Sequence, residues 1–315
     1  MELPEYTDEE IVAARPEKAD VDPWEPYAYH VEEERSAAGT VDDVATLFLT
    51  NRECPFRCLM CDLWTNTTDE TVPEGAVPAQ IDYALDRLPD ARHVKLYNSG
   101  NFFDRKAFPP SDRPAIAERV QDFDTVIVEN HPKLCRDVCV EFRDRLGGRL
   151  EIALGLETAH PTVLDRLNKR MTRDDFRRAV GFLRENDIDV RTFILLRPPF
   201  LSEDEGVVWA LRSIEFAFDA GVQCVSVVPT RSGNGIMQQL EKDDHFEPPS
   251  MPSIETVLEE GLRMNRSRVF MDLWDLERFY ECETCGPKRR ERLRRMNLTQ
   301  TVQPPVQCTC SDRQR

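Results

Sequence analysis

The residues best suited to chemistry are three cysteines on one short segment, Cys54-Pro-Phe-Arg-Cys58-Leu-Met-Cys61. Three thiolates at this spacing can hold three irons of a four-iron cluster and leave the fourth iron without a protein ligand. A zinc site would need a fourth ligand, which His93 or the cysteines near the C-terminus could supply, and the odd count disfavours a disulfide. We therefore expect Cys54, Cys58 and Cys61 to bind an iron–sulfur cluster whose open iron accepts a small molecule.

The elements that must position this loop are read from hydrophobic periodicity. From Val44 onward, short β-branched runs alternate with longer amphipathic stretches, which predicts an α/β fold with a parallel sheet. Strands are expected at 44–50, 93–99, 124–130, 150–157, 189–196 and 222–229. Helices are expected at 80–88, 113–121, 133–146, 173–186, 203–221 and 253–265. Six units suit an open partial barrel or a doubly wound sheet, and both place the site at the carboxyl ends of the strands.

Composition divides the 315 residues into three parts. Residues 1–43 are acidic and proline-rich and predict an arm, residues 44–265 form the βα domain, and residues 266–315 form a small cysteine-containing element. Within the domain, residues 230–252 are rich in glycine and proline and predict a loop.

Charge and hydropathy restrict the class of protein. The net charge is −17, from 58 acidic and 41 basic residues, so the surface repels polyanions except where basic residues gather. The chain has no apolar run of about 18 residues and no signal-peptide pattern at its start, so we expect a cytoplasmic protein without membrane attachment. In a reducing compartment, clustered cysteines bind metal more often than they form disulfides.

The three-cysteine loop, placed directly after the first strand of a βα array, resembles the radical S-adenosylmethionine (SAM) superfamily over residues 44–235. The resemblance implies a partial (βα)6 barrel, a [4Fe–4S] cluster, SAM as cofactor, and reductive cleavage of SAM to a 5′-deoxyadenosyl radical that abstracts hydrogen from substrate. It also implies a reductant such as flavodoxin or ferredoxin. The phrases KLYNSGNFFD, VIVENHP, EIALGLET and LLRPPFLSEDE further resemble the archaeosine-forming radical SAM enzymes of archaeal tRNA modification and, more distantly, the elongator catalytic subunit.

Within this resemblance, two positions depart from the superfamily pattern. Met60 precedes the third cysteine, where members commonly carry an aromatic residue near the adenine, and its thioether can still contact a ring. Asn98, Ser99 and Gly100 end the second strand, where many members carry a Gly-Gly-Glu motif that binds the SAM amino group. Asn98 and Ser99 can supply oxygen acceptors and Gly100 permits close approach of the backbone, although an ordinary polar turn would look the same.

Three charged residues at later strand ends complete the set that the resemblance implies for SAM. Glu129 lies at the end of the third strand, Glu157 closes the fourth, and Arg197 follows the fifth between apolar residues and two prolines. The carboxylates are placed to reach SAM or substrate, and the guanidinium to clamp a SAM carboxylate. Solvated strand-end side chains are the alternative, and Asn168 and Lys169 are weaker candidates after the fourth strand. The sequence identifies no catalytic residue.

The last part of the chain carries a second set of thiols. Cys282, Cys285, Cys308 and Cys310 form two close pairs around the basic run KRRERLRR. Such pairs suit a zinc site or an auxiliary iron–sulfur cluster, with free surface thiols as the alternative. A fixed site would aim the arginines of the run in one direction, toward phosphate. The three remaining cysteines, expected to fill the core, are Cys135, Cys139 and Cys224.

Three functions follow from these patterns. The first is a radical SAM enzyme acting on a tRNA base, with the basic run as its local RNA contact. The second is a radical SAM enzyme acting on a small metabolite or peptide, for which an acidic surface is no obstacle. The third is a non-catalytic iron–sulfur or zinc protein that retained the cysteine loop, supported by the missing Gly-Gly-Glu glutamate.

Overall fold

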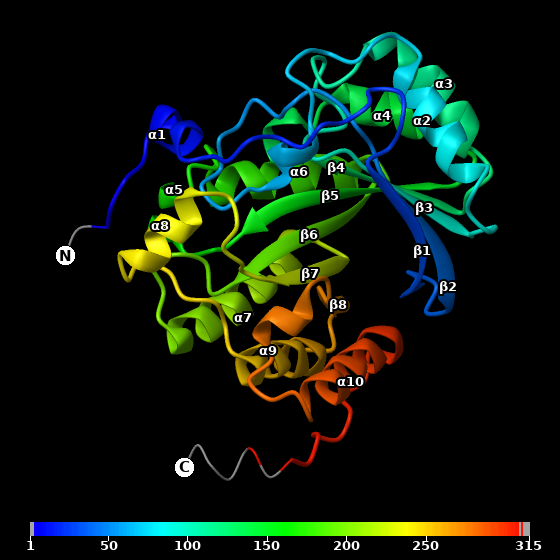
Figure 1. The fold of residues 1–315 in the computed structure, drawn as a ribbon. Coiled ribbons are helices and arrows are strands. Elements are labelled where there is room, and N and C mark those ends of the chain that lie inside the picture. The colour runs from blue at the N-terminus through cyan, green and yellow to red at the C-terminus, as the bar shows by residue number, and fades with distance from the viewer. Residues whose placement is uncertain (1–2, 309, 311–315) are drawn as a thin grey trace.

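One eight-stranded sheet organises the chain in the computed structural model, which describes residues 3–308 and 310 (Figure 1). Its strands, in spatial as in chain order, are β1 (Ala28–Arg35), β2 (Val41–Phe48), β3 (His93–Tyr97), β4 (Thr125–Asn130), β5 (Arg149–Glu157), β6 (Asp189–Leu196), β7 (Cys224–Pro229) and β8 (Arg268–Met271). The first strand is antiparallel to β2, and every later neighbour is parallel. The carboxyl ends of β2 to β8 therefore meet at one edge, called here the carboxyl edge.

Helices between the parallel strands cover the outer face of this sheet (Figure 1). They are α2 (Ala76–Leu85), α3 (Arg113–Val120), α4 (Asp137–Arg143), α6 (Arg173–Glu185), α7 (Glu203–Ala220) and α9 (Met251–Arg263). Further helices are α1 (Asp8–Ala13), α5 (Pro161–Arg166), α8 (Ile236–Lys242) and α10 (Gly286–Thr299). Local sequence sets several boundaries, since Thr172 caps α6 and Gly221, at φ 100°, ends α7. Within the described residues, no helix is both long and apolar enough to cross a membrane.

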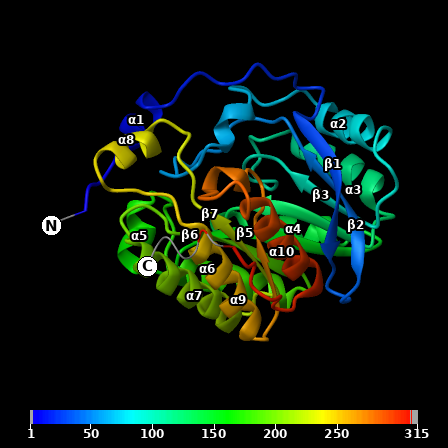
Figure 2. The ribbon, with the colours of Figure 1, turned by 60° about the horizontal axis from the view of Figure 1, so that its bottom comes forward.

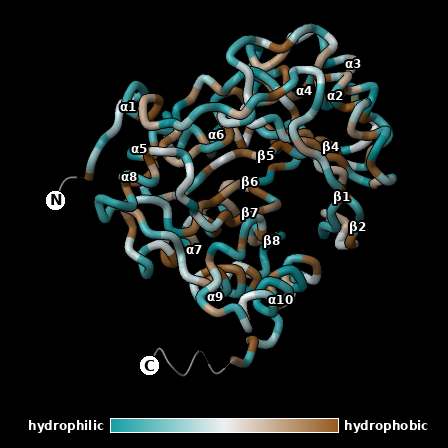
Figure 3. The backbone as a smooth tube through the Cα atoms, viewed as in Figure 1, coloured by the Kyte–Doolittle hydropathy of each residue, from teal (hydrophilic) through white to brown (hydrophobic). Residues whose placement is uncertain are grey.

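The two faces of the strands have opposite character. In β3, Val94 and Leu96 face outward into the main hydrophobic core against the helices. The alternate residues Lys95 and Tyr97 face the concave side, because side chains alternate along a strand. Figure 3 shows hydrophobic stretches along the central strands and hydrophilic ones over the peripheral loops. The main core thus lies between the sheet and the helices, while the lumen of the curled sheet contains charged side chains.

Ion pairs cross the lumen and show how strongly the sheet curls. Lys95 on β3 and Arg191 on β6 both pair with Glu34 on β1, at 2.7 and 2.5 Å. Glu151 on β5 joins Arg191 at 2.6 Å and Arg268 on β8 at 2.8 Å. Burial alone would raise the pKa of Glu34, but the charges of Arg191 and Lys95 outweigh it and lower that pKa. These pairs fill the part of the lumen away from the carboxyl edge, called here the lower lumen. The sheet forms an open barrel, because no backbone pairing joins β1 to β8 in the described chain.

Side chains rather than backbone bridge the open side of the barrel. Arg294 of α10 pairs with Glu33 of β1 at 2.5 Å, and Arg35 donates to the carbonyl of Leu298 at 3.3 Å. Figure 2 shows α10 lying across this side, next to β1. The peripheral segments thus complete the wall of the barrel.

All six expected strands are present, but the peripheral segments differ from expectation. The expected arm contains β1, the C-terminal element contains β8, and the expected loop at 230–252 contains α8. Strand β1 was not predicted because its sequence, AYHVEEER, contains carboxylates that would normally face solvent. Their partners, Lys95 and Arg191, lie on other strands of the barrel. With helices on one face and a polar lumen on the other, the doubly wound alternative is wrong.

Candidate functional site

The three-cysteine loop follows β2 at the carboxyl edge, and residues from distant parts of the chain hold its backbone. Asn168 donates from Nδ2 to the carbonyl of Arg57 at 2.8 Å. Asn234 donates from its own Nδ2 to the carbonyls of Leu59 and Cys61, at 2.8 and 3.0 Å. Because the loop is fixed by amides that come after β5 and β7, its conformation depends on the complete barrel.

The sulfurs of this loop lie in a shielded environment. Cys58 is buried, and Cys54 and Cys61 are half-buried. Burial raises the pKa of the Cys58 thiol to about 11, so metal binding must displace its proton. Asn101 donates from Nδ2 to the sulfur of Cys54 at 3.0 Å, and such donors stabilise negative charge on a ligating thiolate. Asn101 was not among the expected site residues.

A buried ion pair lies next to the cysteine loop. The register of β5 against β6 shifts between Gly155 and Glu157, and Glu157 takes a left-handed φ of 66°. Bulges of this kind redirect a side chain, here into a 2.5 Å contact with the Nζ of Lys169. Burial disfavours the ammonium, but the carboxylate and the nearby Cys58 and Cys61 outweigh this effect and raise the pKa of Lys169. The charges favour a cationic Lys169 beside the three sulfurs.

His131, which the sequence did not single out, connects the cysteine loop to Lys169. Its Nδ1 accepts the amide of Lys133 at 3.1 Å, so Nε2 carries the proton and donates to the carbonyl of Lys169 at 3.0 Å. Burial lowers the pKa of His131 to about 3, which keeps the ring neutral. Phe56 of the cysteine loop stacks on this ring with centroids 3.9 Å apart. His131 therefore positions both elements without charge.

The end of β3 approaches the same place. Gly100 lies against Cys54, and the carboxylate of Glu129 on β4 accepts the amide of Asn98 at 3.1 Å. Burial raises the pKa of Glu129 to about 7, although the amides of Asn98, Ser99 and Gly100 favour its ionised form. Asn98 keeps one buried acceptor, Oδ1, without a hydrogen-bond partner in the described structure. Asn98, Ser99, Gly100 and Glu129 thus form one unit beside the cysteines.

Met60 and Arg197 are placed differently from this unit. Met60 packs between two apolar clusters, with Leu59 in one of them and Phe200 in both. The guanidinium of Arg197 is occupied by Glu203 and Glu247, at 2.6 and 2.5 Å. Arg197 lines a separate hollow of about 430 Å³, and the three loop cysteines are not part of that lining.

The expectation that the basic run points one way is wrong. Arg289 pairs with Glu255, and Arg294 pairs with Glu33 on β1. Of the four arginines expected to meet phosphate, Arg289, Arg290, Arg294 and Arg295, only Arg290 and Arg295 are exposed and outside the ion pairs of the described residues. Helical geometry distributes neighbouring side chains around α10, so the run cannot present a single basic face.

The chain is similar in sequence to archaeal proteins. It is 26% identical over 225 residues to the archaeosine synthase subunit beta of Thermococcus kodakarensis, covering 68% of this chain and 69% of that protein. It is 24% identical to the subunit of the same name from Methanosarcina acetivorans, covering 81% and 78%. An uncharacterised protein of Methanocaldococcus jannaschii is 25% identical and covers 85% of this chain and 80% of its own. No family model matches.

Solved structures share the fold. Methylornithine synthase superposes with a TM-score of 0.52 at 14% identity, covering 82% of this chain and 73% of that one. The Elp3 protein of Methanocaldococcus infernus superposes with a TM-score of 0.50 at 12% identity, covering 81% and 63%. The chain therefore has the open α/β barrel of radical SAM enzymes, and its relatives by sequence include archaeosine synthase subunits.

Proposed function

We propose that the protein is a radical SAM enzyme that cleaves SAM reductively at a [4Fe–4S] cluster and acts on a base of tRNA. The observation that carries the proposal is the three-cysteine loop at the carboxyl edge of an open barrel, fixed from the ends of several strands. When bound, the cluster and SAM would supply one-electron chemistry and a carbon-centred radical. A reductant such as flavodoxin or ferredoxin would deliver the electron.

The residues around the loop fit these groups. Three thiols leave one iron open, the amide of Asn101 favours thiolate at Cys54, and Lys169 offsets negative charge nearby. For SAM, the unpartnered Oδ1 of Asn98 offers an acceptor for an ammonium group. Glu129 holds the backbone around Asn98, and Glu157 holds Lys169. Asn98 therefore takes the place of the missing Gly-Gly-Glu carboxylate, and Met60 stays a candidate neighbour of the adenine.

The part of the lumen near the carboxyl edge, called here the upper lumen, is suited to a flat substrate. Phe48 on β2 contacts Tyr97 on β3, with ring centroids 6.2 Å apart, and Tyr97 contacts Phe193 on β6 at the same separation. These three rings are half-buried, so part of each faces the lumen above the ion pairs. Aromatic rings recognise an unstacked nucleobase by stacking. Together with the archaeosine synthase relatives, this row favours a tRNA base as the substrate.

The acidic surface favours a second candidate, a radical SAM enzyme acting on a small molecule or peptide. A net charge of −17 weakens contact with phosphates over most of the surface. Incubating reconstituted enzyme with bulk archaeal tRNA and, separately, with its free nucleosides distinguishes the two. A base modification formed only in intact tRNA supports the first function, and turnover of a nucleoside alone supports the second.

Release of 5′-deoxyadenosine under strictly anaerobic conditions with dithionite tests the cofactor chemistry itself. The wild type should release it, and the variant with Cys54, Cys58 and Cys61 all changed to Ala should not. The variant with Cys135, Cys139 and Cys224 all changed to Ala is the matched control and should retain cleavage. Cleavage that persists without the loop cysteines would contradict the proposal, as would a wild type that binds the cluster but never cleaves SAM.

A further inference from the structure

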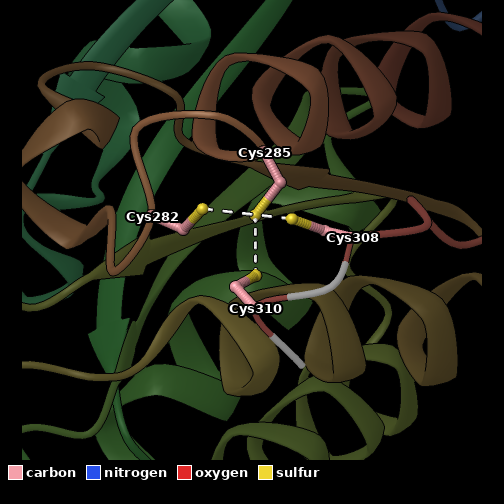
Figure 4. Close-up of side chains that lie close together, drawn as sticks. All are labelled: Cys282, Cys285, Cys308 and Cys310. Atoms are coloured by element: carbon pink, nitrogen blue, oxygen red, sulfur yellow. Dashed lines mark hydrogen bonds between the residues drawn. The ribbon is translucent and has the colours of Figure 1, made fainter. Parts of the chain in front are cut away.

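A second group of sulfurs lies far from the cysteine loop in sequence. Cys282 and Cys285 lie between the short helix η4 (Leu276–Phe279) and α10, while Cys308 and Cys310 come from the C-terminal segment. Figure 4 shows the four sulfurs pointing toward a common centre. All four Sγ atoms lie within 4.8 Å of one another, with 4.0 Å between Cys282 and Cys308 and 3.5 Å between Cys285 and Cys310.

These separations select the kind of group that fits. A tetrahedral zinc ion with bonds of about 2.3 Å places its sulfurs about 3.8 Å apart. A four-iron cluster would hold its ligand sulfurs roughly 6 Å apart, because each sulfur binds a different corner of the cube. A disulfide would bring two sulfurs to about 2 Å, and all four thiols are free. The measured spacing matches one metal ion.

Backbone and side-chain contacts hold the segment around Cys282 and Cys285. The amide of Gly286 donates to the carbonyl of Cys282 at 2.8 Å, which closes the turn between the first two cysteines. Gly286 lies against the ring of Tyr280, where a side chain would overlap the ring. Cys285 caps the N-terminus of α10, whose dipole stabilises the negative charge of a four-thiolate site.

Arg292 brings the second pair of cysteines to the first. Its guanidinium donates to the carbonyls of Gln303 and Pro304, at 2.6 and 2.8 Å. The same side chain pairs with Glu255 and Glu259 of α9, at 3.0 and 2.7 Å. The C-terminal segment is thereby laid along α10 toward Cys282 and Cys285.

We propose that Cys282, Cys285, Cys308 and Cys310 bind one zinc ion in a closed four-thiolate site with a structural role. The site fastens the C-terminal segment to the start of α10, the helix that borders β1 on the open side of the barrel. Four protein ligands leave no open position, so the ion takes no part in SAM chemistry. The proposal is independent of the proposed function, because it involves none of the residues around Cys54.

Metal analysis of four full-length proteins tests this proposal. The wild type, the Cys54/Cys58/Cys61→Ala variant and the Cys135→Ser/Cys139→Ser control should each contain about one zinc per chain. Cys308→Ser/Cys310→Ser should contain none and melt at a lower temperature. Cobalt added to the metal-free wild type should give the visible absorption bands of a tetrahedral thiolate site. These bands should be absent from the Cys308→Ser/Cys310→Ser variant.

Three results would overturn the proposal. The first is zinc retained in the Cys308→Ser/Cys310→Ser variant. The second is iron with sulfide retained in the Cys54/Cys58/Cys61→Ala variant. The third is a wild-type protein that lacks zinc and whose four C-terminal cysteines resist alkylation because they form disulfides. Loss of SAM cleavage in the Cys54/Cys58/Cys61→Ala variant with zinc intact would separate the two metal sites. Failure of the proposed function would leave the zinc result unchanged.

Discussion

The Nζ of Lys169 lies 2.5 Å from a carboxylate oxygen of Glu157, and Gly155 provides the space for this contact. A Cβ at Gly155 would overlap both atoms of the pair. The ion pair that the bulge in β5 creates therefore occupies the space that a side chain at Gly155 would need. The ion pair, the bulge and the glycine form one unit beside the cysteine loop.

Changing Gly155 to Ala should separate this buried pair and lower the free energy of unfolding by about 1–3 kcal/mol, the range expected when buried polar groups lose their partners. It should also weaken SAM binding to the reconstituted enzyme. Gly181→Ala on α6 is the matched control, because nothing lies within 4 Å of the added Cβ. There the helix should gain roughly 0.5–1 kcal/mol. Urea unfolding of both variants checks this, and equal stability of the two would contradict it.

The stability of the metal-free protein should depend on Glu129. Its pKa is raised from 4.5 to about 7 by burial, so the folded state holds this proton more tightly than the unfolded state. The contribution to stability is therefore present below about pH 4.5 and is lost as pH rises through 7, a change of about 3 kcal/mol. Glu129→Gln should remove this slope. Unfolding curves of both proteins from pH 4.5 to 8 give the difference, and parallel curves would refute the assignment.

Removing the amide donor at Cys54 should lower the reduction potential of the cluster. Asn101→Leu leaves the thiolate without its hydrogen bond, so the reduced cluster loses stabilisation, by on the order of tens of millivolts. Asn130→Leu is the control, since Asn130 donates to Cys135, which lies outside the loop. Spectroelectrochemical titration measures both. Equal potentials for Asn101→Leu and the wild type would show that this contact does not tune the cluster.

Removing only one partner of the ion pairs in the lower lumen should strongly lower the free energy of unfolding. Arg191→Met leaves Glu34 and Glu151 without the guanidinium between them and should lower the free energy of unfolding by about 3–5 kcal/mol. Arg263→Met removes the surface pairs with Glu259 and Glu260 and should change the free energy of unfolding by less than about 0.5 kcal/mol. Urea unfolding checks both, and a small effect at Arg191 would mean that water already screens the lumen.

Much of the site was predictable because its first component is local. Cys54, Cys58 and Cys61 lie within one stretch of eight residues that follows a strand, so their spacing already marks them as a ligand set. The alternation of short β-branched runs with longer amphipathic stretches likewise predicted the parallel sheet and the carboxyl edge where Glu129 and Glu157 lie. Such signals survive in the sequence because they depend on neighbouring residues.

Tertiary structure decided what depends on distant partners. The lumen-facing carboxylates of β1 look like a solvated arm until Lys95 and Arg191 are seen opposite them. His131 and Asn101 are ordinary polar residues in the sequence, and only their contacts with Lys169 and Cys54 reveal what they position. The spacing of the tail cysteines left both zinc and an iron–sulfur cluster open, because both use thiolate pairs. Sulfurs within 4.8 Å of one another leave room for a single ion, and that distance exists only in the folded chain.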